Sequence, residues 1–242
     1  PMGVPEFKIR TEIKQHQIAV FSSNYALYGD LSKRVMDVLS DFTPDIENYS
    51  IDEAFLNFKN TNTTNFEACG IQMKQRVQKW IGLPVCIGFA ETKALSKVAN
   101  KIAKKFQERT GGVYVIDSEE KRIKALKWTK VEDIWGIGFQ LSKKMKAFGM
   151  ISAYDFTLPH NEDFIKRTMG VVGKRLRAEL SGHAVLELEQ QPETKKSIAV
   201  TRTFEKSIAN LSELKERVST FATVASEKLR LQKSCCYGIV LY

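Results

Sequence analysis

Two adjacent carboxylates, Asp52 and Glu53, interrupt an otherwise apolar and aromatic stretch. Neighbouring side chains of an extended strand point to opposite faces, so these acids can share a ligand only if the backbone turns sharply. We therefore expect a tight turn over residues 50–53, between an incoming strand over 46–49 and an outgoing strand over 54–58. The simpler alternative is a solvated hairpin tip with no special chemistry.

The residues around this pair form a recognisable signature. The run Tyr49-Ser50-Ile51-Asp52-Glu53-Ala54-Phe55 resembles the palm motif of the Y-family translesion DNA polymerases. Within that family, the run from Phe21 to Tyr28 is most similar to the UmuC type, the catalytic subunit of the SOS mutagenic polymerase. The resemblance extends over essentially all 242 residues.

The resemblance implies a metal-dependent enzyme. In the family the two motif acids bind catalytic magnesium, so two Mg²⁺ ions are expected, with Asp52 bridging both and Glu53 holding the ion that activates the primer hydroxyl. Magnesium takes few carboxylates together with substrate phosphates, and two such ions stabilise an in-line phosphoryl displacement. The implied activity is that of a DNA-directed DNA polymerase, a nucleotidyltransferase that copies past damaged bases in the SOS response and DNA repair.

The charge balance favours a polyanionic partner. The formal net charge is +9 and the pI about 9.3, which indicates nucleic acid first and an anionic membrane surface second. No stretch approaches the length of a membrane-spanning helix, and no signal-peptide pattern opens the sequence. We expect a soluble, cytoplasmic, bacterial protein, associated with the nucleoid by resemblance.

The four cysteines carry no metal or disulfide signal. Cys69, Cys86, Cys235 and Cys236 lack pairwise zinc spacing, and the vicinal pair is a poor disulfide. We expect free, buried thiols.

Hydrophobic periodicity predicts an α+β fold. Helices are expected over 25–40, 66–80 and 91–105, and strands over 84–90 and 113–116, besides the acidic hairpin. A further strand is expected from Gln17, ending at a helix N-cap supplied by Ser23 or Asn24. Gly88 fits a place where another backbone or the substrate approaches closely. The order of elements predicts a palm-like sheet with helices on one face.

The lysine-rich helix carries a basic stripe. Lys93, Lys97, Lys101 and Lys104 follow helical spacing on one face. The simpler interpretation is a solvated face. Beside a metal site, the ammonium groups would instead neutralise triphosphate and primer-template phosphates. By resemblance, Lys104 matches the palm lysine that contacts the incoming nucleotide's phosphates, and Lys97 and Lys101 are assigned to DNA.

A Gly-Ile-Gly sequence follows between two short helices. Gly136, Ile137 and Gly138 resemble the turn of a helix-hairpin-helix, in which glycines let the backbone approach a DNA phosphate and helix amides bind it. Lys143 and Lys144 follow on the next helix and would add positive charge. An ordinary helix–helix turn is the alternative.

The region around this motif is helical throughout. An amphipathic helix over 118–128 leads into it, and the run from Met169 to Arg175 repeats the glycine pattern in weaker form, with Lys174 close by. The resemblance identifies this region as the thumb.

A polar, proline-containing linker is expected over 190–196. Beyond it, the pattern predicts a strand over 197–204, a helix over 211–232 and a strand over 238–242. This order resembles the first half of the family's little finger, in which Arg202 would follow template phosphates.

The resemblance implies five segments. Residues 1–22 end the fingers, 23–116 form the catalytic palm, 117–189 the thumb with its helix-hairpin-helix, 190–196 the linker and 197–242 a partial little finger. The family's first palm strand, most of its fingers and the second half of its little finger have no counterpart here. We expect either a fragment or a truncated gene product.

Three functions remain open. The leading hypothesis is UmuC-like translesion synthesis on damaged primer-template DNA with deoxynucleoside triphosphates. The alternative is a catalytically inactive DNA-binding remnant, and a third is a regulatory partner that docks on repair proteins. The family's partners imply an SOS accessory dimer of UmuD type, the recombinase filament and the sliding clamp.

Overall fold

The computed structural model describes residues 3–189, 194–204 and 206–242. The chain divides into two compact units, Pro1–Gln190 and Gln191–Tyr242. This division falls at the start of the predicted linker, of which residues 190–193 lie outside the described residues. The boundary between palm and thumb within the first unit stays a prediction.

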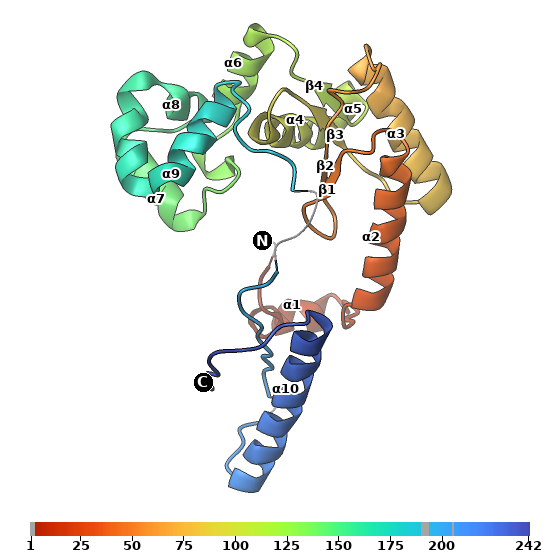
Figure 1. Ribbon diagram of the computed structural model, residues 1–242, viewed down its shortest axis with the longest axis vertical. Coiled ribbons are helices and arrows are strands. Elements are labelled where there is room, and N and C mark those ends of the chain that lie inside the picture. Colours follow the sequence, from red (N-terminus) through yellow and green to blue (C-terminus); the bar gives the residue numbers. More distant parts are fainter. Residues whose placement is uncertain (1–2, 190–193, 205) are drawn as a thin grey trace. The chain divides into compact units, whose positions relative to one another are not determined.

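The elements follow one another in the order labelled in Figure 1. The first unit contains η1 (Glu6–Lys8), α1 (Arg10–Gln15), α2 (Tyr25–Ser40), β1 (Ile46–Asn48), β2 (Ala54–Leu56), α3 (Phe66–Ile81), β3 (Ile87–Phe89), α4 (Lys93–Lys105), α5 (Gln107–Thr110), β4 (Val113–Val115), α6 (Glu119–Trp128), η2 (Val131–Asp133), α7 (Phe139–Ala147), α8 (Ala153–Thr157), η3 (Pro159–Asn161) and α9 (Glu162–Leu180). The second unit contains α10 (Leu211–Leu231). The α+β class predicted from the sequence is confirmed.

Several helices begin directly after an Asn or Ser whose side chain caps the first turn. The Asn24 carboxamide oxygen accepts from Leu27 N at 3.1 Å at the start of α2, and Asn65 accepts from Ala68 N at 2.9 Å at the start of α3. Ser118 caps α6 in the same way. Each cap satisfies an amide that the first turn leaves without an intrahelical partner. The predicted helices at these positions are therefore confirmed.

The strands pair as two short sheets. β1 and β2 form an antiparallel hairpin in which Glu47 faces Phe55, and β3 and β4 pair in parallel, with Gly88 facing Tyr114. No ladder joins the two sheets among the described residues. The acidic hairpin is consequently attached to the rest of the unit by side chains rather than by strand pairing.

Three predicted strands are wrong. The segment from Gln17 to Asn24, residues 197–204 and residues 238–242 carry no strand in the part of the chain that the structure describes. Apolar alternation indicates which face of a strand would be buried, whereas a strand also needs a neighbour that pairs with its backbone. No described segment supplies that neighbour to any of the three.

Helix α4 lies at the centre of the first unit. Its apolar face, including Leu95, Val98 and Ile102, joins one core with residues of α6, α8 and α9 such as Leu126 and Phe156. Figure 1 shows α7, α8 and α9 gathered as one helical group, which α6 connects to β4. Burying each of these large side chains contributes about 1.5–3 kcal/mol. The predicted palm and thumb therefore share one hydrophobic core through α4.

The approach of β3 to α4 depends on Gly88. A Cβ at this position would lie 2.2 Å from Asn100 N and 2.5 Å from Ser96 O. The expected close approach is confirmed, and the neighbour is the backbone of α4.

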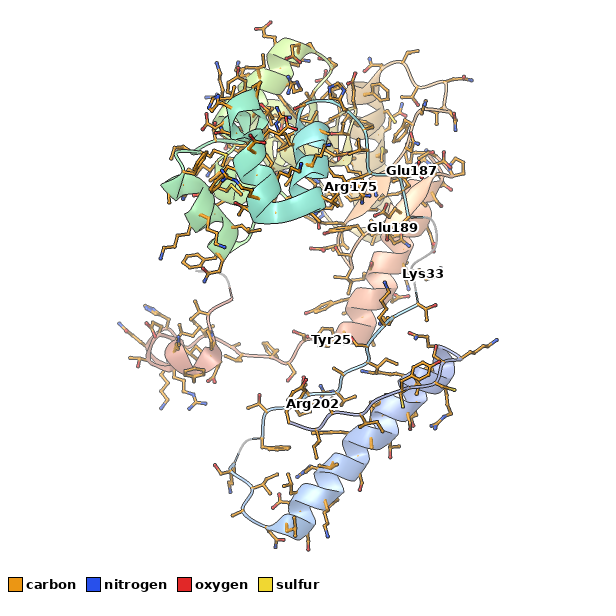
Figure 2. The ribbon with its side chains drawn as sticks, turned by 60° about the vertical axis from the view of Figure 1, so that its left-hand side comes forward. Tyr25, Lys33, Arg175, Glu187, Glu189 and Arg202 are labelled. Carbon is orange, nitrogen blue, oxygen red and sulfur yellow. The ribbon has the colours of Figure 1, made fainter. Side chains whose placement is uncertain are left out.

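The start of α4 is fixed by a buried acid from the end of α9. The Glu179 carboxylate, 0% exposed, accepts from Ala94 N at 3.1 Å, Val185 N at 2.8 Å and Leu186 N at 2.9 Å. These bonds satisfy a buried charge that would otherwise be costly. They also hold the segment after α9, on which Figure 2 labels Glu187 and Glu189.

Two expectations from the sequence, on the cysteines and on membrane-spanning helices, can be compared with the structure. All four cysteines are free, but Cys69 and Cys86 are only partly buried and Cys235 and Cys236 are exposed, so the expectation of buried thiols is wrong. Among the described residues, no helix combines the length and apolar character needed to cross a membrane.

Candidate functional site

The acidic pair lies at the tip of the β1–β2 hairpin. The amides of Tyr49 and Ser50 both donate to Glu53 O at 3.0 Å, which closes a tight turn. Ser50 Oγ donates to Asp52 Oδ1 at 2.7 Å inside that turn. The predicted strand–turn–strand is confirmed, and it presents both carboxylates from one short loop.

The two carboxylates have different surroundings. Asp52 is exposed, and the hydroxyl of Ser50 is its hydrogen-bond partner. Glu53 is half-buried, and its Oε1 lies 2.8 Å from Lys97 Nζ, whose side chain is only 19% exposed. Asp52 is therefore open to a ligand, whereas Glu53 is already neutralised by a cation of the chain.

Three aromatic rings surround the ammonium of Lys97. The centroids of Tyr49, Phe55 and Trp135 lie 5.5–5.6 Å from one another. Lys97 Nζ is 4.4 Å from the Tyr49 ring, 5.5 Å from Phe55 and 5.8 Å from Trp135. Trp135 Nε1 donates to the Tyr49 hydroxyl at 2.9 Å. Sequence reasoning missed the role of Trp135, and its only signal was its position directly before Gly136.

The basic stripe of α4 faces acids of the chain along most of its length. Lys93 pairs with the buried Glu47 of β1, and Lys101 Nζ lies 2.5 Å from Asp133 Oδ1. Together with the pair of Lys97, these contacts fix α4 against the hairpin and η2, so the interpretation as a solvated face holds only for the end of the stripe. There Lys104 is exposed, and no partner is found for it among the described residues.

The Gly-Ile-Gly sequence forms a turn between η2 and α7. Gly136 has φ +83°, a left-handed conformation that favours glycine, and Gly138 is the N-cap of α7. No atom lies within 4 Å of a Cβ built at either glycine, so the backbone is open on that side. Ile137 is buried, while Lys143 and Lys144 are exposed on α7. Free amides at a helix start, beside lysines, suit an anionic ligand.

The second glycine pair breaks α9. Gly170 has φ 62° and ψ −142°, so the helix stops and begins again at this residue. The new turn exposes Val171 and Val172, and Lys174 and Arg175 follow on its surface. Figure 2 labels Arg175 within the helical group. The weaker repetition in the sequence is therefore a second helix start with basic residues.

Arg202 belongs to the second unit and lies in an extended segment without a strand. Its guanidinium donates to Thr201 O at 3.0 Å, and the side chain is exposed (Figure 2). Its predicted contact with template phosphates stays a prediction.

The donor set at the hairpin tip suits a hard divalent cation. Carboxylate oxygens are the ligands that Mg²⁺ accepts, and this ion binds one or two protein carboxylates while water and phosphates complete its shell. No group of three or more His, Cys, Asp or Glu able to hold a metal is found in residues 3–189, 194–204 and 206–242. Asp52 and Glu53 supply two carboxylates from one turn, which is the number of protein carboxylates that such an ion binds.

Solved structures with a similar fold include DNA polymerases. The insertion ternary complex of Dbh DNA polymerase superposes with a TM-score of 0.60, at 23% identity, over 93% of this chain and 64% of that chain. A Y-family polymerase chimera of Dbh and Dpo4 gives 0.63, at 23% identity, over 77% of this chain and 54% of that chain. The fold is therefore that of the Y-family DNA polymerases.

Sequence comparison places the chain more narrowly. Residues 2–101 match the impB/mucB/samB family, and residues 195–242 match the C-terminal domain of the same family. The chain belongs to the impB/mucB/samB family, and the UmuC-type resemblance is confirmed.

Individual relatives agree with this assignment. The protein MucB of Escherichia coli is 35% identical over 242 residues, which cover 100% of this chain and 57% of MucB. The protein UmuC of Salmonella typhimurium is 36% identical over 235 residues, which cover 97% of this chain and 56% of UmuC. The chain therefore spans somewhat more than half the length of these relatives.

Proposed function

We propose that this chain carries the catalytic palm acids and the DNA-binding thumb of a translesion DNA polymerase of the SOS response. The observation that supports this most strongly is the hairpin tip, where Asp52 and Glu53 leave the same tight turn in a fold shared with polymerases. Template-directed nucleotidyl transfer needs carboxylates at one point beside a phosphate-binding surface.

Each site residue has a role in this proposal. Asp52 and Glu53 hold Mg²⁺, which when bound lowers the barrier to phosphoryl transfer by polarising phosphate oxygens. Lys104 contacts the phosphates of the incoming deoxynucleoside triphosphate. Its exposure at the unpaired end of the α4 stripe supports this role. Lys97 and Lys101 can contact DNA only if their ion pairs with Glu53 and Asp133 open.

The thumb contacts are proposed for the two glycine turns. The open backbone at Gly136 and Gly138 would receive a primer-template phosphate, with Lys143 and Lys144 adding charge. Lys174 would act similarly at the second helix start. Arg202 would contact the template strand from the second unit.

The partners are proposed from the resemblance to the UmuC type rather than from a surface of this chain. An SOS accessory dimer of UmuD type, the recombinase filament and the sliding clamp are proposed as partners. A bacterial cytoplasmic location, in association with the nucleoid, is proposed on the same basis.

DNA binding without catalysis is the second candidate function. It is favoured by the glycine turns, which combine open backbone with exposed lysines and contain no acid of the hairpin. Because both functions share the thumb, only a change at the acids separates them.

Alanine at both Asp52 and Glu53 provides that change. Under the proposed polymerase function, primer extension with Mg²⁺ is abolished while primer-template retention persists. Glu67→Gln, an exposed acid in the first turn of α3, is the matched control and should extend normally. If the wild-type protein binds primer-template DNA but never extends it, the second function is favoured. Retention that does not weaken with salt would contradict both.

A further inference from the structure

The ammonium of Lys97 forms an ion pair with Glu53, a carboxylate that the proposed function gives to a metal ion. We propose that Lys97 is a resident cation which holds Glu53 in the metal-free protein and gives it up when a divalent cation binds. This inference rests on the proposed function, since it takes Glu53 as a metal ligand. It makes Lys97 a positioning residue for the hairpin tip in the metal-free protein.

The geometry explains why a lysine is held there. Its Nζ lies 2.8 Å from Glu53 Oε1 and 4.4 Å from the Tyr49 ring centroid, with two further rings within 5.8 Å. An ammonium over several aromatic faces is stabilised by their quadrupoles even without its carboxylate. Lys97 can therefore release Glu53 and remain in the pocket of Tyr49, Phe55 and Trp135.

The ion pairs of the two neighbouring lysines on α4 differ from that of Lys97. Lys93 is bound to the buried Glu47 and also donates to Glu187 O at 2.6 Å, so it is fixed from two sides. Lys101 pairs with Asp133, which lies on η2 and not on the hairpin. Of the three lysines, Lys97 alone is paired with an acid of the hairpin tip.

The pocket also connects the hairpin to the thumb turn. Trp135 supplies one ring and donates its indole N–H to the Tyr49 hydroxyl at 2.9 Å, and the next residue is Gly136. The residue that precedes the proposed phosphate-binding turn thus completes the pocket of the ammonium bound to Glu53. A change at Glu53 should be visible at Trp135.

Competition between Lys97 and a divalent cation for Glu53 predicts the direction in which removal of Lys97 changes the affinity for the metal. A divalent ion at Glu53 meets the positive charge of Lys97 a few ångströms away, and this repulsion weakens its binding. Lys97→Met removes the charge and keeps an unbranched chain among the rings. Binding of Mn²⁺, measured by the electron paramagnetic resonance of the free ion without DNA or nucleotide, should tighten about tenfold or more.

Matched variants make the result specific. Lys101→Met removes the same charge one turn along the helix, from a lysine paired with Asp133 rather than with a hairpin acid, and should change Mn²⁺ affinity much less than Lys97→Met does. Equal or weaker binding in Lys97→Met, with binding still lost in Glu53→Gln, would overturn this inference alone. Unchanged binding in both Asp52→Asn and Glu53→Gln would overturn the proposed metal site, and the inference with it.

Trp135 gives a second readout that does not depend on the folding of the lysine variant. The protein has three tryptophans, so Trp80→Phe with Trp128→Phe leaves Trp135 as the single emitter. Mg²⁺ should change its emission as Lys97 leaves Glu53, and Glu53→Gln should abolish the change. Emission that stays constant while the metal site fills would contradict the release of Lys97.

Discussion

The indole Nε1–H of Trp135 donates to the hydroxyl of Tyr49 across 2.9 Å and joins residues 86 positions apart in the sequence. Tyr49 opens the turn that presents the acidic pair, and Trp135 precedes the first glycine of the thumb turn. The bond joins the hairpin to the turn between η2 and α7. It therefore contributes to the position of the hairpin tip as well as to stability.

Removing this bond should lower the free energy of unfolding slightly, and the effects of substituting its two partners should not be additive. Trp135→Phe and Tyr49→Phe each keep a ring but remove one partner, and each should lower the free energy of unfolding by about 0.5–1.5 kcal/mol. The double variant should cost less than the sum, because both changes remove one bond. Urea unfolding of the four proteins measures this, and strict additivity would show that the bond contributes nothing.

Gly88 should not tolerate a side chain. A Cβ there would lie 2.2 Å from Asn100 N, and this backbone of α4 cannot move without shifting the core. Gly88→Ala should therefore lower the free energy of unfolding by about 1–3 kcal/mol or more, as overpacking does.

Gly29→Ala is the matched control for this prediction. Gly29 lies inside α2 with no atom within 4 Å of its added Cβ. Alanine should therefore stabilise the protein by up to about 1 kcal/mol. Thermal unfolding distinguishes the two variants, and equal effects would show that the close approach of β3 to α4 is not as described.

Glu179 should matter through its charge and its two acceptor oxygens. Glu179→Gln replaces one acceptor by an amide that faces a backbone donor, either Ala94 N or the pair at Val185 and Leu186. The expected loss of stability is about 1–3 kcal/mol. Hydrogen exchange at Val185 and Leu186 should accelerate, and exchange as slow as in the wild type would contradict this role.

Asp155 should make stability depend on pH in the acidic range. Its burial acts to raise the pKa of the carboxyl, but hydrogen bonds from Ser152 N, Ile151 N and the Ser152 hydroxyl outweigh burial and lower the pKa. A lowered folded-state pKa gives stability that is fully present above the unfolded pKa and is lost as pH falls through the folded value. That loss should begin near about pH 4.

Asp155→Asn tests this dependence. The variant loses the charged member of the Ser152 capping box and should be less stable by about 1 kcal/mol at neutral pH. Its stability should then fall less steeply below about pH 4 than that of the wild type. Parallel pH profiles of the two proteins would show that the carboxylate does not produce the dependence.

Much of the fold could be predicted from short-range signals in the sequence. The helix at 25–40 could be predicted because Asn24 caps it and apolar residues recur at helical spacing, and the acidic turn could be predicted because two carboxylates interrupt a strand pattern. These features depend on neighbours within a few residues, which a sequence displays directly.

Long-range contacts explain what the sequence did not reveal. The strand predicted over 197–204 had the right alternation but has no partner strand in the described part of the chain. The stripe containing Lys97 had the right spacing, yet its acids lie on the hairpin and on η2. No local pattern in the sequence marks Glu179 as a buried acceptor, because only the packing of α9 against α4 makes it one. Partners distant in sequence cannot be read from periodicity.

The most direct test of the proposed polymerase function is incorporation of one nucleotide opposite a defined template base, with Mg²⁺, by the wild type and Asp52→Asn. Asp52 is exposed, and its hydrogen-bond partner is the hydroxyl of Ser50 within the same turn, so the substitution should leave the fold intact. Because the family's first palm strand has no counterpart in this sequence, both proteins carry a homologous first strand and fingers in this test. The unsubstituted protein should insert the complementary nucleotide, and Asp52→Asn should be slower by about a thousandfold or more, as for loss of a metal ligand. Equal rates in the two proteins would contradict the assignment of the hairpin tip as the catalytic centre.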